Sequence, residues 1–359
     1  MKRGALEALL FAAIALTSLA SCIEWSTNSQ GQLQSFGLPG LPVWQTQTLS
    51  EQKRLAANGE LAAAPGSTVD PDAAQLAASS SDAPWLEDMN RWRTRAGVDP
   101  VGENFGLSNA GAAHACYLVK NGPPEPAAFF AYENALGGAA HTEDPGNQFF
   151  TRAGSEAARR GDISWERDPN SDINSLVEAP FHRLSILAPW VRVAGYGDCG
   201  RWPRRAATLV LRGSTPAGLS KTIVFPPDGS SVAGVMRGRE WPNPLAACPG
   251  YSFPVGTPLT VQFGAFVRVS LKSYSIEDAT TGREVEACGF DSSTYPGTWG
   301  RRVLLSYGAL VVIPRAPLAP GHTYSASIGT QRHELKWTFE VEANEPRTRR
   351  THRDSYPRS

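Results

Sequence analysis

The sequence predicts an α+β protein with two successive domains: helices packed on a small antiparallel sheet, then an all-β sandwich. Apolar residues recur at helical spacing before residue 178, whereas short runs after residue 190 alternate polar and apolar residues. The composition agrees, because 19% charged residues with 34 Gly and 28 Pro suit a loop-rich, partly β, exported chain better than a helical bundle. At 359 residues the chain is long enough for two ordinary domains and tails.

The N-terminus has the pattern of an export signal. Lys2 and Arg3 precede an apolar run, residues 9–16, that is shorter than the roughly 20 residues needed to span a bilayer. A Leu-Ala-Ser-Cys sequence ending at Cys22 follows, and it resembles a bacterial lipobox, in which lipid is attached to the cysteine. We therefore expect residues 1–21 to be a lipoprotein signal peptide and Cys22 to be lipidated, with a simple secretory signal as the alternative.

Four cysteines remain when Cys22, the expected lipidation site, is set aside. An even number in an exported chain indicates two disulfides, and three pairings are possible. If a domain boundary falls near residue 215, each bridge stays within a domain, which pairs Cys116 with Cys199 and Cys248 with Cys288. The chain has no CxxC pair, so we expect neither a structural zinc knot nor a thioredoxin-type site.

Residues 22–82 are rich in Gln, Ser, Ala, Gly and Pro and lack a sustained hydrophobic period. This composition indicates a flexible tether that holds the folded part away from a membrane. The first domain, residues 83–214, is expected to open with a helix that starts at Pro84 and stops at Gly97.

A second helix is expected to start at Ser108 as its N-cap and to end at Asn121. His114 lies on the same face of this helix as its apolar residues, where a lone histidine is more often a satisfied core residue than a ligand. A Pro- and Gly-rich loop is then expected to lead to His141.

Two short helices are expected next, at residues 154–160 and 173–178. Residues 190–197 and 206–211 have the pattern of paired strands. Helices followed by strands within about 130 residues indicate helices packed on a small antiparallel sheet.

The second domain, residues 215–345, is expected to be a β-sandwich, because strand patterns recur at short intervals between Gly and Pro turns. The tail, residues 346–359, carries five arginines and is expected to be disordered. The expected strands are residues 224–229, 257–263, 267–271, 304–307, 310–314, 324–328 and 337–341.

The first domain resembles the CAP superfamily of cysteine-rich secretory, antigen 5 and pathogenesis-related proteins (SCP-like domains), in its bacterial branch. The match runs in order from residue 84 to about 213. The second domain resembles bacterial Ig-like modules. The residues that carry the first resemblance are Asn90-Arg91-Trp92-Arg93 with Gly97 and Pro100, His114-Ala115-Cys116-Tyr117, 141–147, 179–187 and Gly195-Tyr196-Gly197, and those that carry the second are 225–229, 317–324 and 337–339.

The CAP resemblance implies an α-β-α sandwich with an open cleft lined by two histidines and two acidic residues, which in some members binds a divalent cation. His141 and His182 correspond to the histidines and are the expected metal ligands for zinc or magnesium. The family's usual Gly-Glu-Asn after the first histidine is missing here. The candidates for the cleft, including three alternative acids and the upstream histidine, are therefore His114, His141, Glu143, Asp162, Glu178 and His182.

Three functions remain open. The first is a lipid-anchored surface protein whose cleft binds a small molecule, lipid, peptide or cell-wall component outside the cytoplasm. The second is a metal-dependent hydrolase, since histidine beside carboxylates can activate water, although the sequence has neither HExxH nor Gly-x-Ser-x-Gly. The third is an adhesin that binds through its Ig-like domain. No nucleic-acid partner is expected, because 34 basic and 34 acidic residues cancel.

Overall fold

The computed structural model of the chain contains helix and sheet in similar amounts, 33% and 31%, so the predicted α+β class is confirmed. The predicted signal peptide, the lipidation site Cys22 and the basic tail lie outside the described residues. The residues that the structure describes are 24–27, 33–37, 44–45, 83–214, 221–238 and 240–343.

The chain divides into two compact units, residues 1–79 and 80–359. In the first unit three short strands pair as an antiparallel sheet, within the segment that is expected to be a tether. The flexibility of that segment stays a prediction. The strands are β1 (Glu24–Thr27), β2 (Leu33–Gly37) and β3 (Trp44–Gln45).

The first half of the larger unit is built on a four-stranded sheet in the order β4-β6-β7-β5. The long central pair, β6 and β7, is antiparallel and contains both of the strands expected between residues 190 and 211. The strands are β4 (Gly102–Glu103), β5 (Gly161–Ser164), β6 (Val191–Arg201) and β7 (Arg204–Gly213).

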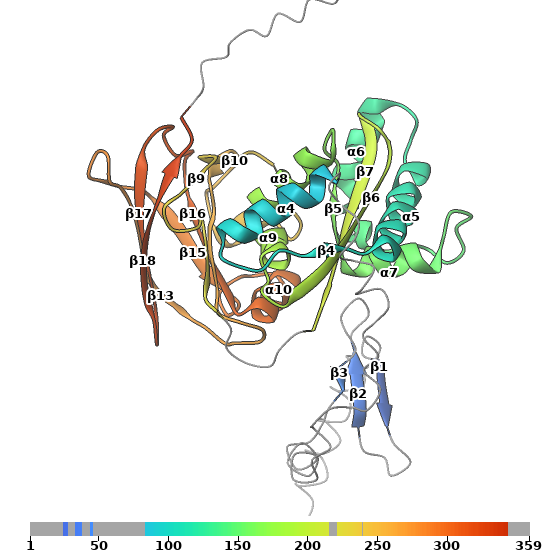
Figure 1. Cartoon of the computed structure of the whole chain (residues 1–359), viewed down its shortest axis with the longest axis horizontal. Helices are drawn as coiled ribbons and strands as arrows, with labels where there is room; N and C mark the ends of the chain where they lie inside the picture. The colour runs from blue at the N-terminus through green and yellow to red at the C-terminus, as the bar shows by residue number, and fades with distance from the viewer. Residues whose placement is uncertain are drawn as a thin grey trace, which may run out of the picture. The chain divides into compact units, whose positions relative to one another are not determined.

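Helices cover both faces of this sheet (Figure 1). Successive side chains of a strand point to opposite faces, and along β7 Ala206 joins the buried cluster of α5, whereas Ala207 and Leu209 join the cluster of α4 and α8. The helices are α4 (Pro84–Arg95), α5 (Phe105–Asn121), α6 (Pro126–Leu136), η2 (Gly137–His141), α7 (Arg152–Arg160), α8 (Pro169–Glu178) and α9 (Pro180–Ile186).

Two glycines of β6 let α5 lie directly on the strand. A Cβ atom at Gly195 would overlap the backbone of Leu107 and Ser108, and one at Gly197 would overlap the backbone of Ala112. The Gly-Tyr-Gly sequence at these positions therefore serves close packing of helix on strand.

The second helix starts earlier than predicted. Asn104, rather than Ser108, caps α5, and its Oδ1 accepts the backbone N–H of Leu107 at 3.0 Å. Asparagine caps helices as well as serine does, and the Ser108 hydroxyl instead donates to Glu103 at 2.7 Å. The expected Pro- and Gly-rich loop also contains a helix, α6, which begins with Pro126 at the position where a proline is tolerated best.

Besides the short pair β10-β11, the second half of the unit contains two sheets of four and five strands, in the orders β15-β16-β12-β8 and β14-β13-β17-β18-β9. Buried side chains of both sheets, such as Val261 and Phe339, belong to one core. The strands are β8 (Ile223–Phe225), β9 (Ser230–Val232), β10 (Val235–Met236), β11 (Val255–Gly256), β12 (Leu259–Gln262), β13 (Leu271–Asp278), β14 (Arg283–Glu284), β15 (Ala287–Asp291), β16 (Ala309–Pro314), β17 (Thr323–Thr330) and β18 (Glu334–Val341).

The prediction that this half is all-β is wrong. It also contains the short η3 turn (Pro244–Ala247) and a ten-residue helix, α10 (Thr298–Tyr307), which includes the run expected as a strand at residues 304–307. Leu304 and Tyr307, at helical spacing, pack into a buried cluster, and Gly308 in a left-handed conformation ends the helix. Short apolar runs fit helix and strand patterns equally well, so the sequence alone did not separate the two.

The two halves of the unit share one hydrophobic core. Met89 of α4 and Ile173 of α8 belong to the same buried cluster as Phe225 and Val261 of the second half. The domain boundary near residue 215 stays a prediction, but the two halves are packed together.

The prediction of disulfide bonding is confirmed, with Cys116 paired to Cys199 and Cys248 to Cys288. This is the pairing expected if each bridge stays on one side of residue 215. Disulfides of this kind are typical of an oxidising, extracytoplasmic environment. Among the described residues, no helix is long and apolar enough to cross a membrane.

Candidate functional site

His182 lies at the start of α9, beside a buried carboxylate from the second half of the chain. Its backbone N–H donates to Oε1 of Glu240 at 2.7 Å, and its ring Nδ1 lies 3.0 Å from the same oxygen without the alignment of a hydrogen bond. Burial alone lowers the pKa of an imidazole, but the carboxylates of Glu240 and Asp162 outweigh burial and raise the pKa of His182 above its usual value.

Glu240 is the site residue that the sequence did not reveal. Its side chain is fully buried, and its Oε2 has no hydrogen-bond partner among the described residues. A buried carboxylate is costly unless a positive charge or a proton is close, and the imidazole of His182 can supply either. Glu240 follows the expected boundary near residue 215, and no spacing pattern around it pointed to a site.

His141, the last residue of η2, is held in its neutral form. Its Nδ1 lies 3.0 Å from the carbonyl oxygen of Ala158, and because a carbonyl only accepts, Nδ1 carries the proton. Burial, and then the neighbouring His182, lower the pKa of His141 to about 4. At neutral pH its Nε2 therefore has a lone pair that can accept a proton or a hydrogen bond.

Asp162 of β5 is the acid that the structure brings to these histidines. Burial raises the pKa of Asp162 to about 6, although His182 and a hydrogen bond from the Ser185 hydroxyl both act in the opposite direction. Sequence reasoning proposed Asp162 from its position alone, as one of three acids.

These four side chains, His141, Asp162, His182 and Glu240, are called the His–acid cluster below. His182 changes the pKa of both His141 and Asp162, and Glu240 changes the pKa of both His182 and Asp162. One imidazole is neutral, the other favours its charged form, and one carboxylate titrates near pH 6. The cluster can therefore hold and exchange a proton close to neutral pH.

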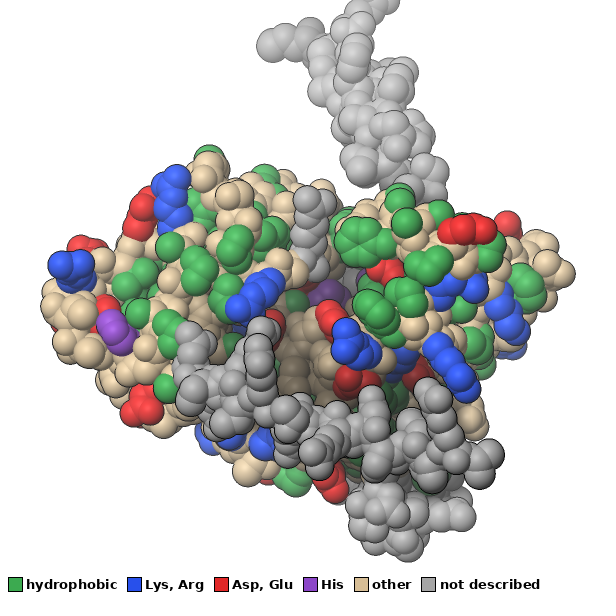
Figure 2. All heavy atoms as spheres, turned by 90° about the horizontal axis from the view of Figure 1, so that it is seen from above, with side chains coloured by type: hydrophobic (Ala, Val, Ile, Leu, Met, Phe, Trp, Pro, Cys, Tyr) green, Lys and Arg blue, Asp and Glu red, His purple; other side chains and the backbone are tan. Residues whose placement is uncertain are grey.

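Two exposed tryptophans lie beside the cluster. Trp241 is 37% exposed and its ring is 5.8 Å from that of His141, while Trp299 is 40% exposed and 5.8 Å from Trp241. Trp241 packs against Gly138, where a Cβ atom would come within 2.5 Å of the indole. Figure 2 shows one face of the molecule hollowed at its middle, with histidine side chains low in the hollow and charged side chains around it.

His114 and Glu143, expected as cleft candidates, form a closed pair in the interior. Nδ1 of His114 lies 2.9 Å from Glu143 Oε1, and its Nε2 lies 2.8 Å from the carbonyl oxygen of Ala140. The other oxygen of Glu143 accepts the backbone N–H of Thr151. Both side chains are 0% exposed, so they connect α5 to the segment before α7 and are not accessible to a ligand.

The structure thus brings together three of the six expected cleft residues, His141, Asp162 and His182. The remaining acid, Glu178, lines a different cavity between α4, α8 and the second half of the chain. Burial of the His114 pair and the position of Glu178 could not be inferred from spacing, because both depend on how distant elements pack.

The His–acid cluster fits a proton better than a metal ion. Among the described residues, no group of three or more His, Cys, Asp or Glu side chains is arranged to hold a metal. Metal ligation requires a neutral imidazole with a free lone pair, which Nε2 of His141 offers, whereas His182 favours its protonated form. Zinc or magnesium at His141 and His182 stays a prediction, and no step below depends on it.

Two members of the cluster give stability opposite pH dependences. The pKa of His141 falls from 6.5 to about 4 on folding, so between these values the unfolded chain binds more protons and stability rises with pH. The pKa of Asp162 rises from 3.8 to about 6, so there the folded protein binds more protons and stability falls with pH. Each contribution is on the order of 3 kcal/mol, and the two largely cancel between pH 4 and 6.

In Asp162→Asn the contribution of His141 is no longer cancelled, so we expect stability to rise from pH 4 to 6.5. In His141→Gln the contribution of Asp162 is no longer cancelled, so we expect stability to fall from pH 4 to 6. Urea denaturation at a series of pH values measures both slopes. The same slope in the two variants would contradict the assigned protonation states.

Two comparisons of the sequence with known proteins found no match. A scan against protein-family models found no match, and a search of curated proteins found no similar sequence.

Proposed function

We propose that the protein is an exported CAP-domain surface protein, anchored through lipid at Cys22, that binds a cell-envelope ligand at the His–acid cluster. The observation that carries the proposal is the position of His182 against the buried Glu240 carboxylate, with Nδ1 3.0 Å from Oε1, together with the electrostatic coupling of His182 to His141 and Asp162. The helices on both faces of the β4-β6-β7-β5 sheet support a CAP-like domain, and the two packed sheets of the second half support an Ig-like one.

Among lipids, peptides and cell-wall components, a sugar ring of a cell-wall glycan fits this site best. A sugar has an apolar face of C–H groups and an edge of hydroxyls. The exposed rings of Trp241 and Trp299 offer flat apolar surfaces, and the adjacent imidazole of His141 offers a hydrogen-bond acceptor. Ligand pockets commonly combine apolar walls with a few polar groups in this way.

Co-sedimentation with insoluble peptidoglycan tests the proposal. We expect the chain with Cys22→Ser, which cannot be lipidated, to sediment with peptidoglycan, and His141→Ala/His182→Ala to weaken binding at least about tenfold. His333→Ala is the matched control, because this exposed histidine contacts Phe263 in the second half and lies outside the cluster. Equal sedimentation of the wild type and the double variant would overturn the proposal. Unchanged zinc uptake by the double variant in equilibrium dialysis would remove the metal hypothesis.

A second candidate function is hydrolysis, and the divergent pKa values of the two histidines favour it. His141 is neutral and can act as a base, whereas the raised pKa of His182 suits an acid. Release of soluble fragments from the same peptidoglycan, with and without chelator, distinguishes hydrolysis from binding. Activity that depends on neither chelator nor His182 would exclude the metal-dependent hydrolase.

The adhesin hypothesis needs a test other than deletion of residues 215–345. Because both halves share one core, deletion would expose the apolar side chains of α4 and α8 and unfold the remainder. Substitution of an exposed residue of the second half, such as Tyr274→Ala, leaves that core intact. Retention of partner binding by such surface variants together with its loss in the cluster variants would dispose of the adhesin hypothesis.

A further inference from the structure

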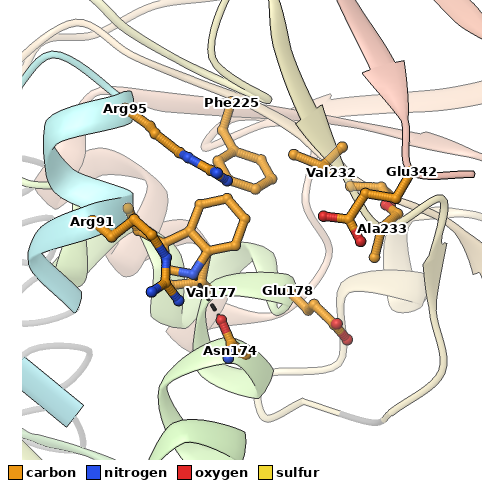
Figure 3. Close-up of a pocket in the computed structure, with 11 residues that line it drawn as sticks. Arg91, Arg95, Asn174, Val177, Glu178, Phe225, Val232, Ala233 and Glu342 are labelled. Atoms are coloured by element: carbon orange, nitrogen blue, oxygen red, sulfur yellow. Dashed lines mark hydrogen bonds between the residues drawn. The ribbon is translucent and has the colours of Figure 1, made fainter. Parts of the chain in front are cut away.

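A cavity of about 340 Å³ lies between α4, α8 and the second half of the chain (Figure 3). None of the four residues of the His–acid cluster lines it. The residues that matter for its chemistry come from both halves of the unit, and they are Arg91, Trp92, Arg95, Glu178, Phe225 and Glu342.

Opposite charges face each other across this cavity. Figure 3 shows Arg91 and Arg95 projecting from α4 on one side, and Glu178 and Glu342 on the other. Arg91 is already paired with Asp88 of its own helix. The guanidinium of Arg95 lies 5.4 Å from the centroid of the Trp92 ring, and no carboxylate of the described residues lies within ion-pair distance of it.

The Glu178 carboxylate also lacks a close partner. Its side chain makes no hydrogen bond or ion pair with the described residues, although its backbone carbonyl accepts a bond from Arg183. Burial raises the pKa of Glu178, and the opposing effects of Arg237 and Arg183 are each smaller. Glu166 and, across the cavity, Glu342 add to the rise. An added positive charge between Glu178 and Glu342 would relieve their repulsion.

Two aromatic rings form a rigid wall between the charged sides. The indole N–H of Trp92 donates to Oδ1 of Asn174 at 2.8 Å, which fixes the plane of the ring. Phe225 lies 5.8 Å from Trp92, and its ring also contacts the buried guanidinium of Arg183 at 3.7 Å. A wall fixed in this way is organised before a ligand arrives.

We propose that this cavity binds a small zwitterion of the amino-acid or short-peptide class, with its carboxylate on Arg95 and its ammonium between Glu178 and Glu342. A simple anion would be repelled by the glutamates, and a simple cation by the arginines, whereas a zwitterion satisfies both sides. The cavity volume suits a ligand of this size, near the lower end of the range for small-molecule sites. This site is distinct from the His–acid cluster and does not depend on the function proposed for it.

Titration calorimetry with three probes tests the proposal: the dipeptide Ala-Leu, its N-acetylated form without an ammonium, and its amide without a carboxylate. We expect only the unmodified dipeptide to bind well, with each blocked form at least about tenfold weaker. Glu178→Gln should weaken binding of the dipeptide about tenfold but leave binding of the acetylated form unchanged. Arg95→Gln should also weaken binding of the dipeptide about tenfold but leave binding of the amide unchanged.

Arg152→Gln serves as the matched control, because this arginine side chain is 92% exposed on α7. The His141→Ala/His182→Ala variant should bind the dipeptide as the wild type does, which separates this site from the cluster. No dipeptide binding up to the solubility limit, equal affinity for all three probes, or wild-type affinity in both Glu178→Gln and Arg95→Gln would each overturn the proposal.

Discussion

Replacing Arg183 with Met is expected to destabilise the folded protein by about 3–5 kcal/mol. Arg183 is fully buried, and its guanidinium donates to three backbone carbonyls, those of Val177, Glu178 and Pro258, at 2.7–2.8 Å. Burial lowers its pKa only to about 9, so it stays charged at neutral pH. Met fills much of the same volume but removes the donor from all three carbonyls, two of whose hydrogen bonds are fully buried.

Urea denaturation measures this loss, with Arg152→Met as the control. The Arg152 side chain is 92% exposed, so its replacement should change the free energy of unfolding by less than about 0.5 kcal/mol. Because Pro258 belongs to the second half of the unit, Arg183 connects the halves, and we expect wild type to unfold in one transition. A loss below about 1 kcal/mol in Arg183→Met, or two separate transitions in wild type, would contradict this interpretation.

Removing the Cys116–Cys199 disulfide is expected to cost about 4 kcal/mol. The bridge joins α5 to β6 across 83 residues, and a closed loop of that length strongly restricts the unfolded chain. The Cys248–Cys288 bridge closes a loop of half that length, with a separation of 40. Loop-closure entropy changes by only about 0.6 kcal/mol for each doubling of length, so its removal should cost slightly less.

Paired Cys→Ala variants of each bridge, compared in urea with the oxidised wild type, measure the two losses. The double variant at Cys116 and Cys199 should be the less stable of the two. The opposite order would show that strain or packing at the individual bridges outweighs loop length.

Several features of the protein were predictable because they depend on short stretches of sequence. A strand can be recognised from the alternation within its own residues, and β6, β7 and five strands of the second half (β8, β12, β16, β17 and β18) were found in this way. The strand expected at residues 267–271 was wrong, because it overlaps β13 only at Leu271. His141 and His182 stood out because they lie within stretches that resemble a known family. Reliance on short stretches also explains why a strand was wrongly predicted at residues 304–307, which belong to α10. A run of this length is too short to distinguish helix from strand.

The acids of the candidate site could not be chosen on the same basis. Glu143, Asp162 and Glu178 were equivalent by position, and only their partners separate them. Glu143 is paired with His114, Glu178 lines the cavity between α4, α8 and the second half, and Asp162 alone of these alternatives joins the His–acid cluster. Glu240 was missed entirely, because it meets His182 from 58 residues away.

The sequence by itself therefore determined the α+β class, the even set of cysteines available for disulfides and the two histidines, all of which are carried by local patterns or counts. Tertiary structure decided which carboxylates reach those histidines, which imidazole is neutral, and that both halves share one core. The physical reason is that burial and charge-to-charge distance set a protonation state. Both quantities depend on side chains that are far apart in the chain and become neighbours only on folding.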